Sequence, residues 1–208
     1  MSASIKKIAV VGGSGQIGQS ILSALVEAKR FDITAISRSD SNAVFAPTIT
    51  VKQGDYSSKE FFLEALKNQE VLIIALAFTV PDELHSRLIS AAAEAGVKFV
   101  LLNEYGSDNA HPLMREVPIN AVKTQHREHV EKLGRSSWIG IVNNPWYDYV
   151  RQFAPAACSL ACAIVVDLRF SHYQEASLVL ISRTKRLPCT IKGTPDSTLR
   201  PAQRLAWQ

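Results

Sequence analysis

The sequence contains few cysteines and no long apolar run. Only three of its 208 residues are cysteine, and all three fall after residue 157. An odd cysteine count without a secretory signal indicates reduced thiols, so we expect a cytoplasmic protein rather than a disulfide scaffold. The longest uncharged stretch near the C-terminus, residues 153–166, includes Pro155 and is too short to span a bilayer comfortably. We therefore expect no membrane segment.

The sequence also lacks a strong charge of either sign. Its 23 basic and 19 acidic residues give a formal net charge of +4. Residues 151–208 hold eight basic and three acidic residues, so residues 1–150 are close to neutral. A near-neutral region offers no electrostatic footprint for nucleic acid, and none is expected as a partner. The apolar fraction of 47% is ordinary for a globular protein.

Short apolar runs alternate with helical patterns through residues 1–150. Helices are expected after the first glycines, from a Ser57-x-x-Glu60 capping box, from Pro81 to Gly96, and near residues 119–133. Parallel strands need crossover connections, so this order predicts an α/β fold of the Rossmann type: a doubly wound parallel sheet with helices on both faces. The predicted strands are residues 7–12, 33–37, 48–55, 71–77, 98–102 and 138–144.

A glycine-rich stretch, VVGGSGQIG, joins the first predicted strand to the first helix. Gly12 permits a tight turn, Gly15 lets the backbone approach a pyrophosphate, and Gly18 lets helix and strand pack closely. The anion would then lie at the N-terminus of the helix. A strand-to-helix turn that binds no ligand is the alternative. The residues predicted to contact a dinucleotide here are Gly12, Ser14, Gly15, Gln16, Ile17 and Gly18.

The end of the second predicted strand indicates which dinucleotide binds. NAD-specific sites usually carry an acidic residue there, but this chain has Arg38 between Ser37 and Ser39. A guanidinium fork suits a 2′-phosphate, so NADPH is favoured over NADH. Asp40 lies close enough to weaken this prediction. Arg38 could otherwise be a solvated surface charge.

Two further pairs are predicted to contact the cofactor. Asp55, beside Tyr56, follows the third strand and could accept a hydrogen bond from the adenine amino group. Asp55 could equally cap the helix that starts near Ser57. Ala77 and Phe78 lie at the carboxyl end of the fourth predicted strand, where open α/β sheets bind ligands.

With these residues placed, the chain resembles the NmrA-like and isoflavone reductase-like family of atypical short-chain dehydrogenases. The stretches that carry the resemblance are VVGGSGQIG, SRSDS, LLNEYGSDNAHP, AVKTQHREHVEK and IVNNPWYDY, in the family's order across about residues 5–150. The resemblance implies NADPH-dependent reduction of a small, often aromatic substrate. It also implies an alternative, because the family includes dinucleotide-sensing regulators without turnover.

Lys123 falls on the family's active-site lysine. An ammonium there could bind the nicotinamide ribose and stabilise developing negative charge. Ordinary short-chain dehydrogenases carry tyrosine four residues earlier, where this chain has Ile119. Tyr105, in the loop after the fifth predicted strand, is a candidate substitute acid. His126 and His129 lie three residues apart, but with no third ligand in view they predict a partly solvated helix face and no metal site.

Residues 151–208 lose the helix and strand periods and become basic. The segment IVVDLRF could still form a strand, as could SLVLIS. Family members usually continue well beyond this length to build a substrate lobe. We therefore expect an NAD(P)-binding domain over residues 1–150, an irregular tail over 151–208, and a substrate lobe that is incomplete because the C-terminus is truncated or altered.

Overall fold

The computed structural model describes residues 5–109, 111–143 and 167–170. The strands are β1 (Lys7–Val11), β2 (Asp32–Arg38), β3 (Ile49–Gly54), β4 (Val71–Ile74), β5 (Phe99–Leu101), β6 (Ser137–Val142) and β7 (Asp167–Phe170). The helices are α1 (Gln16–Glu27), α2 (Lys59–Leu66), α3 (Asp82–Glu94), α4 (Pro112–Arg115) and α5 (Pro118–Leu133).

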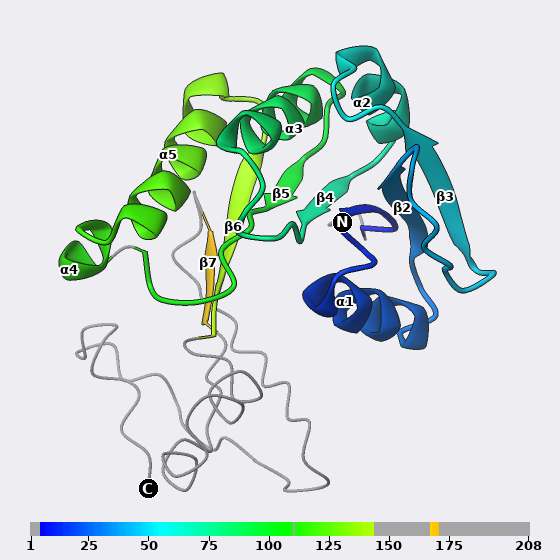
Figure 1. Ribbon diagram of the computed structural model, residues 1–208, viewed down its shortest axis with the longest axis horizontal. Helices are drawn as coiled ribbons and strands as arrows, with labels where there is room; N and C mark the ends of the chain where they lie inside the picture. Colours follow the sequence, from blue (N-terminus) through cyan, green and yellow to red (C-terminus); the bar gives the residue numbers. More distant parts are fainter. Residues whose placement is uncertain (1–4, 110, 144–166, 171–208) are drawn as a thin grey trace, which may run out of the picture.

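All seven strands lie in one sheet, in the order β3-β2-β1-β4-β5-β6-β7 (Figure 1). The first six are parallel, while β7 pairs with β6 in the antiparallel direction. The order grows outward from β1 in both directions, which is the doubly wound arrangement of the Rossmann type. The predicted fold class is confirmed.

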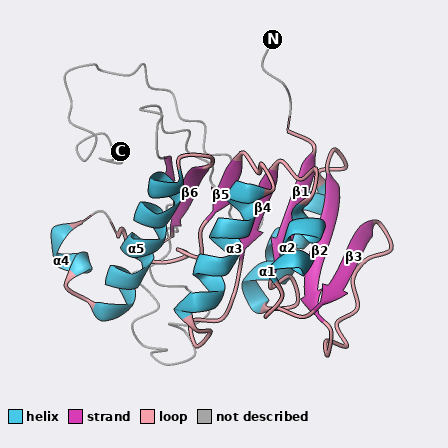
Figure 2. Ribbon diagram, turned by 90° about the horizontal axis from the view of Figure 1, so that it is seen from above, coloured by secondary structure: helices cyan, strands magenta, loops and turns pink. Residues whose placement is uncertain are grey.

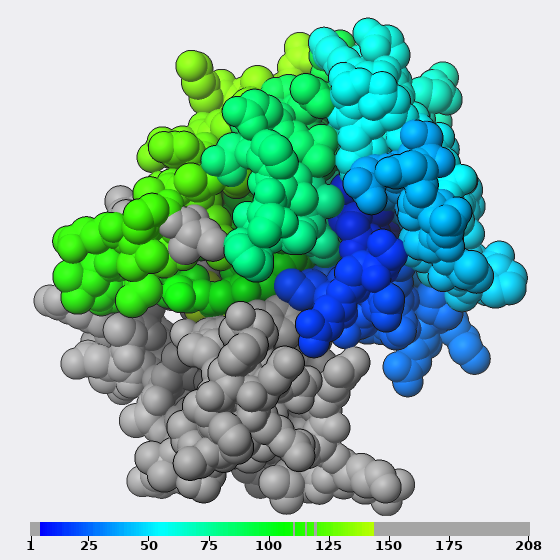
Figure 3. Space-filling view, viewed as in Figure 1, coloured from blue at the N-terminus to red at the C-terminus, as the bar shows by residue number. Residues whose placement is uncertain are grey.

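Helices cover both faces of the sheet (Figures 1 and 2). Ile8 and Val10 of β1 face α1, whereas Ala9 and Val11 belong to the core beneath α2, α3 and α5. This division follows from the two-residue period of a strand. Every residue of β4 is buried, as expected for a central strand covered on both faces. Figure 3 shows α2 and β3 at one end of the described part and α4 and α5 at the other.

The helix ends follow local sequence signals, with one correction. The predicted Ser57-x-x-Glu60 capping box is wrong: Ser58 caps α2 alone, its hydroxyl accepts a hydrogen bond from the Phe61 amide at 3.1 Å, and the third residue after this cap is Phe61 rather than a glutamate. Ser57 instead bonds to Asp55, which takes it out of the capping position. Pro81 precedes α3, and Gly96 ends that helix with a φ of +79°.

Other segments differ from the predicted pattern. β4 ends at Ile74, so Ala77 and Phe78 lie in the loop beyond it. The short helix α4 was not predicted. Within the predicted tail, residues 167–170 form β7, part of the segment IVVDLRF. SLVLIS, the three cysteines and the rest of the tail lie outside the described residues. Among the described helices, none is both long and apolar enough to cross a membrane.

Candidate functional site

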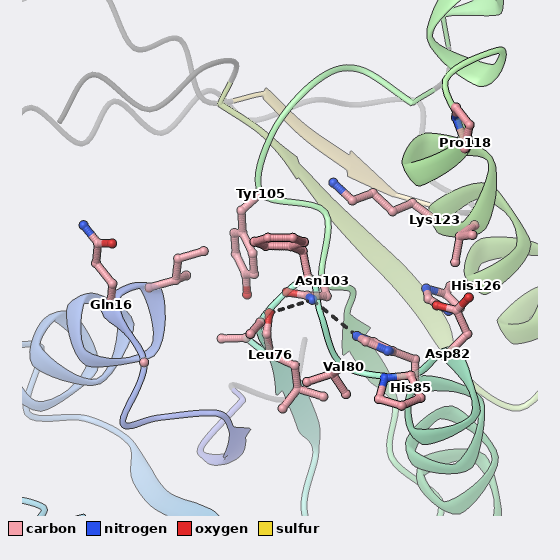
Figure 4. A pocket seen from close by; sticks show the side chains of 17 residues that line it. Gln16, Leu76, Val80, Asp82, His85, Asn103, Tyr105, Pro118, Lys123 and His126 are labelled. Carbon is pink, nitrogen blue, oxygen red and sulfur yellow. Dashed lines mark hydrogen bonds and ion pairs between the residues drawn. The ribbon is translucent and has the colours of Figure 1, made fainter. Parts of the chain in front are cut away.

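A cavity lies at the carboxyl ends of the strands, where the strand order reverses between β1 and β4. Ligands bind at this point in open α/β sheets. The cavity has a volume of about 800 Å³ and separates the start of α1 from α5 (Figure 4). Its lining residues are Gly15, Gln16, Ile17, Ala75, Leu76, Ala77, Phe78, Val80, Pro81, Asp82, His85, Asn103, Tyr105, Pro118, Val122, Lys123 and His126.

The glycine loop has the geometry that its spacing predicts. Gly12 has a φ of +80°, and a Cβ there would lie 2.3 Å from the Ala75 carbonyl oxygen. A Cβ on Gly18 would lie 2.1 Å from the Gly12 carbonyl oxygen, so only glycine lets α1 approach β1 this closely. Gly15 precedes α1 without a side-chain cap, and the first turn contains no acidic residue. The first-turn N–H groups of α1 are therefore available to an anion.

Arg38 ends β2 with its side chain 66% exposed. Its Nε atom lies 3.4 Å from Oδ1 of Asp40. Asp40 therefore pairs with the guanidinium that was predicted to bind the 2′-phosphate. The remaining guanidinium donors are free to meet another anion. Ser37 is buried, and the Ser39 amide donates to the Gly54 carbonyl at 2.9 Å.

Asp55 and Tyr56 hold the chain between β3 and α2. Asp55 accepts hydrogen bonds from the Ser57 amide and hydroxyl, and these bonds lower the pKa of its carboxyl group. The Tyr56 hydroxyl donates to the Ile36 carbonyl at 2.8 Å, and burial raises its pKa to about 12. Both residues are therefore already engaged in local contacts, although Asp55 is exposed and can accept a further bond.

The loop after β4 forms an apolar wall of the cavity. Ala77 and Phe78 line it, as predicted, together with Leu76 and Val80. Phe78 is 82% exposed, which is unusual for so large an apolar side chain. An exposed ring at the mouth of a cavity is available to contact a ligand.

Lys123 extends from α5 into the cavity toward the loop that carries Tyr105 (Figure 4). Its Nζ lies 3.8 Å from the point where a Cβ on Gly106 would stand. Burial lowers the pKa of Lys123 below its ordinary value of 10.5, and the Glu104 carboxylate partly opposes this shift. Burial raises the pKa of Tyr105, which disfavours ionisation of its hydroxyl.

Two histidines meet on the cavity wall near Lys123. The ring of His126 stacks on that of His85 from α3, with centroids 4.8 Å apart, and Asp82 completes a cluster whose ligand-type atoms lie within 4.8 Å of one another. The prediction of a partly solvated helix face was therefore wrong for His126, which is buried. Both partners of His126 in this cluster, Asp82 and His85, come from α3, which spacing along α5 cannot reveal, and His129 is not a member of it. His85 Nε2 already faces the Asn103 amide at 3.3 Å, and Asn103 also donates to the Leu76 carbonyl (Figure 4).

The structure separates the predicted site residues into two groups. Gly15, Gln16, Ile17, Ala77, Phe78 and Lys123 line the cavity. Gly12, Ser14, Gly18, Ser37, Arg38, Ser39, Asp55 and Tyr56 lie outside it, on or beside the ends of β1, β2 and β3. Asn103 was not among the predicted site residues. It lies just after β5, at the carboxyl end of a strand, where open α/β sheets bind ligands; the same position indicated Ala77.

Comparison with known proteins identifies the family. The NmrA-like family matches residues 4–156. The chain belongs to the NmrA-like family. The match covers the sheet through β6, the glycine loop and Lys123.

Two curated relatives are oxidoreductases. The chain is 29% identical over 194 residues to oxidoreductase aprR of Aspergillus flavus, covering 90% of this chain and 60% of that protein. It is 30% identical over 158 residues to quinone oxidoreductase 2 of Escherichia coli, covering 72% of this chain and 52% of that protein. The chain thus spans between half and two thirds of the length of these relatives.

A solved structure of AtPrR2 with NADP+ and (+)-pinoresinol shares the fold. The TM-score is 0.62 at 23% identity, covering 71% of this chain and 53% of that one. A leucoanthocyanidin reductase–NADPH complex from Vitis vinifera gives 0.56 at 21% identity, covering 69% and 50%. At this level of identity the likeness establishes the Rossmann-type fold.

Proposed function

We propose that the chain is an NADPH-binding oxidoreductase that reduces a small substrate, with aromatic molecules as the first candidates. The observation that carries this proposal is the convergence of the glycine loop and Lys123 on one cavity at the switch point of the sheet. The names of relatives in the family, which include a quinone oxidoreductase and reductases solved with NADP+ or NADPH, support it.

The residues present fit a dinucleotide. The tight packing of Gly12 and Gly18 leaves the uncapped start of α1 open to a pyrophosphate. The exposed Arg38 would meet the 2′-phosphate of NADPH, in competition with Asp40. Asp55 would accept from the adenine amino group. The nicotinamide end would lie in the cavity beside Ala77, Phe78 and Lys123.

The groups in the cavity suit reduction of a polar bond. NADPH supplies a hydride when bound, and the substrate atom that gains negative charge must then be stabilised or protonated. The Lys123 ammonium is held in a partly buried place where its charge acts more strongly than in water. The apolar loop of Leu76, Phe78 and Val80 would contact the body of the substrate.

Binding at the glycine loop is tested by titrating NADPH against the wild-type chain, Gly15→Ala and Gly15→Asp. A Cβ at Gly15 meets nothing closer than 3.4 Å, so Gly15→Ala preserves the fold and separates the effect of an added side chain from that of an added charge. A carboxylate about 4 Å from the pyrophosphate costs roughly 4 kcal/mol, which is more than a hundredfold in affinity. Equal affinities of wild type and Gly15→Asp would contradict the proposal.

A further inference from the structure

Glu104 and its neighbours alternate in direction along the loop after β5. Asn103 and Tyr105 both line the cavity, while Glu104 between them is only 1% exposed and does not. The chain bends at Asn103, where the Glu104 amide donates to the Leu102 carbonyl at 2.8 Å, and the loop presents Asn103 and Tyr105 to the cavity and Glu104 away from it. The carboxylate of Glu104 is therefore buried directly behind two residues of the site.

Arg127 of α5 binds both oxygens of this carboxylate. Its Nε donates to Oε1 at 2.7 Å and its Nη2 donates to Oε2, while Asn109 Nδ2 also donates to Oε2 at 3.0 Å. The forked contact fixes the guanidinium and the carboxylate in one plane and one orientation. Arg127 is 8% exposed, so the pair is shielded from solvent on both sides.

Strand β6 provides the place in which the pair lies. The guanidinium carbon of Arg127 lies 4.4 Å from the centre of the Trp138 ring, and Trp138 donates to Glu131 of α5 at 2.8 Å. A Cβ on Gly140 would lie 3.0 Å from Oε2 of Glu104 and 3.3 Å from Nη2 of Arg127. Glycine at this position of β6 therefore leaves the room that the ion pair occupies.

The pair joins the two walls of the cavity. Arg127 lies four residues after Lys123, one turn along the same side of α5. Glu104 belongs to the loop that forms the opposite wall through Asn103 and Tyr105, and Lys123 Nζ approaches Gly106 of the same loop. Movement of the loop relative to α5 would therefore change the position of Lys123 relative to Tyr105 and Asn103.

Stability alone does not account for this arrangement. Desolvation offsets much of the attraction within a buried ion pair, and apolar replacements of similar volume are often at least as stable. Fixed geometry is what a forked pair supplies and apolar contacts do not. We propose that Glu104 and Arg127 are positioning residues, which hold the loop after β5 against α5 and thereby set the place and charge of Lys123. The proposal rests on the reductase function proposed above.

The test compares Glu104→Gln with Gly140→Ala and with Glu70→Gln. Glu104→Gln preserves the side-chain shape and removes the charge, while Gly140→Ala displaces the pair by a few tenths of an ångström and retains both charges. Glu70→Gln is the matched control. Glu70 pairs with Lys98 at 3.0 Å just before β4 and β5, at the amino-terminal ends of the strands and therefore opposite the cavity. Two readouts are taken from folded protein: the Lys123 pKa by NMR of labelled lysine side chains without cofactor, and kcat and KM with NADPH.

We expect Glu104→Gln to lower the Lys123 pKa, because the carboxylate that favours the ammonium is gone. We also expect kcat to fall at least about tenfold, since small displacements of a reacting group are costly, with KM for NADPH changed less than about twofold. Gly140→Ala should lower kcat in the same direction, which keeps the test decisive if Glu104→Gln does not fold. Glu70→Gln should change neither readout.

An unchanged Lys123 pKa in folded Glu104→Gln would overturn the positioning role. An unchanged kcat in both Glu104→Gln and Gly140→Ala would overturn it as well. Failure of the wild-type chain to bind NADPH would instead overturn the proposed function. The two failures are distinguishable because the Lys123 pKa is measured without cofactor.

Discussion

Gly18 packs so closely on Gly12 that a Cβ on Gly18 would stand 2.1 Å from the Gly12 carbonyl oxygen. The contact joins the first turn of α1 to the end of β1, and it places the helix N-terminus beside the cavity. The six-residue spacing from Gly12 to Gly18 is therefore required by backbone packing, whether or not a ligand is bound. The middle glycine, Gly15, carries no such restraint, because a Cβ there would make only ordinary contacts.

Gly18→Ala should therefore destabilise the fold, while Gly15→Ala should not. Overpacking of this kind costs about 1–3 kcal/mol in the free energy of unfolding. Urea denaturation of the two variants beside the wild type measures the difference. Equal midpoints for Gly18→Ala and wild type would show that α1 can move away from β1 at little cost.

Much of the fold could be predicted from local patterns. Buried runs such as residues 71–77 indicate strands by their length and apolar content alone, and the alternation with helices then restricts the topology. The glycine loop could be predicted because the backbone requires glycine at two of its positions: Gly12 has a φ of +80°, and Gly18 packs against Gly12 too closely for a side chain. The cap of α2 was misplaced because Ser57 and Ser58 offer the same local signal. The end of β4 was misplaced because strand pairing ends before the apolar run does.

The contacts across the site could not be predicted in this way. His85 and His126 are 41 positions apart and meet only because α3 packs against α5. Glu104 lies in a stretch that carries the family resemblance, but nothing near it in the sequence identifies Arg127 as its partner. Pairings between distant segments depend on the assembled sheet, whereas helix and turn signals depend on a few adjacent residues.

Arg38→Ala should remove most of the proposed preference for NADPH over NADH. A charge-assisted hydrogen bond to the 2′-phosphate contributes about 1.5–3 kcal/mol, which is tenfold or more in affinity. NADH affinity should barely change, because NADH lacks that phosphate. Titration of both dinucleotides against the wild type and the variant measures the effect.

Asp40→Asn is the matched control for this prediction. It removes the carboxylate that lies 3.4 Å from Arg38, so it should raise NADPH affinity rather than lower it. If the unmutated chain binds NADH as tightly as NADPH, Arg38 acts only as a surface charge.

Stability should fall as the pH is lowered from 7 to 5. Burial lowers the pKa of His126 from 6.5 to about 4, and burial also lowers the pKa of His85. The unfolded chain therefore binds protons more readily than the folded chain in this window, so folding is favoured above pH 6.5 and loses stability as pH falls toward 4. His126 alone contributes up to about 2 kcal/mol of this loss.

Urea denaturation at pH 7, 6 and 5 measures the slope of the free energy of unfolding against pH. His126→Asn should flatten it, and His129→Asn on the same helix controls for the loss of a histidine. The window stays above the range in which Glu70 titrates, since hydrogen bonds from the Lys6 amide and Lys98 lower the pKa of Glu70 to about 2. A slope that His126→Asn leaves unchanged would place the titrating group elsewhere.

Lys123→Met should abolish most NADPH-dependent turnover and largely preserve NADPH binding. The methionine side chain is similar in length but carries no charge, so it removes the ammonium that would stabilise negative charge on the substrate. Loss of such a group lowers kcat by roughly 10²–10⁴-fold. The measurement is hydride transfer from NADPH to a panel of quinones, aromatic enones and aromatic ethers. Lys132→Met, an exposed lysine on the last turn of α5, is the matched control.

The pH dependence of turnover gives a second measure of the same residue. Because burial lowers the pKa of Lys123, the decline of kcat at high pH should begin below the ordinary lysine value of 10.5. Brisk turnover that survives Lys123→Met would remove this lysine from the reaction. Tight NADPH binding without turnover on any acceptor would favour the alternative that the chain senses the dinucleotide, because in that case Lys123 would serve the cofactor alone.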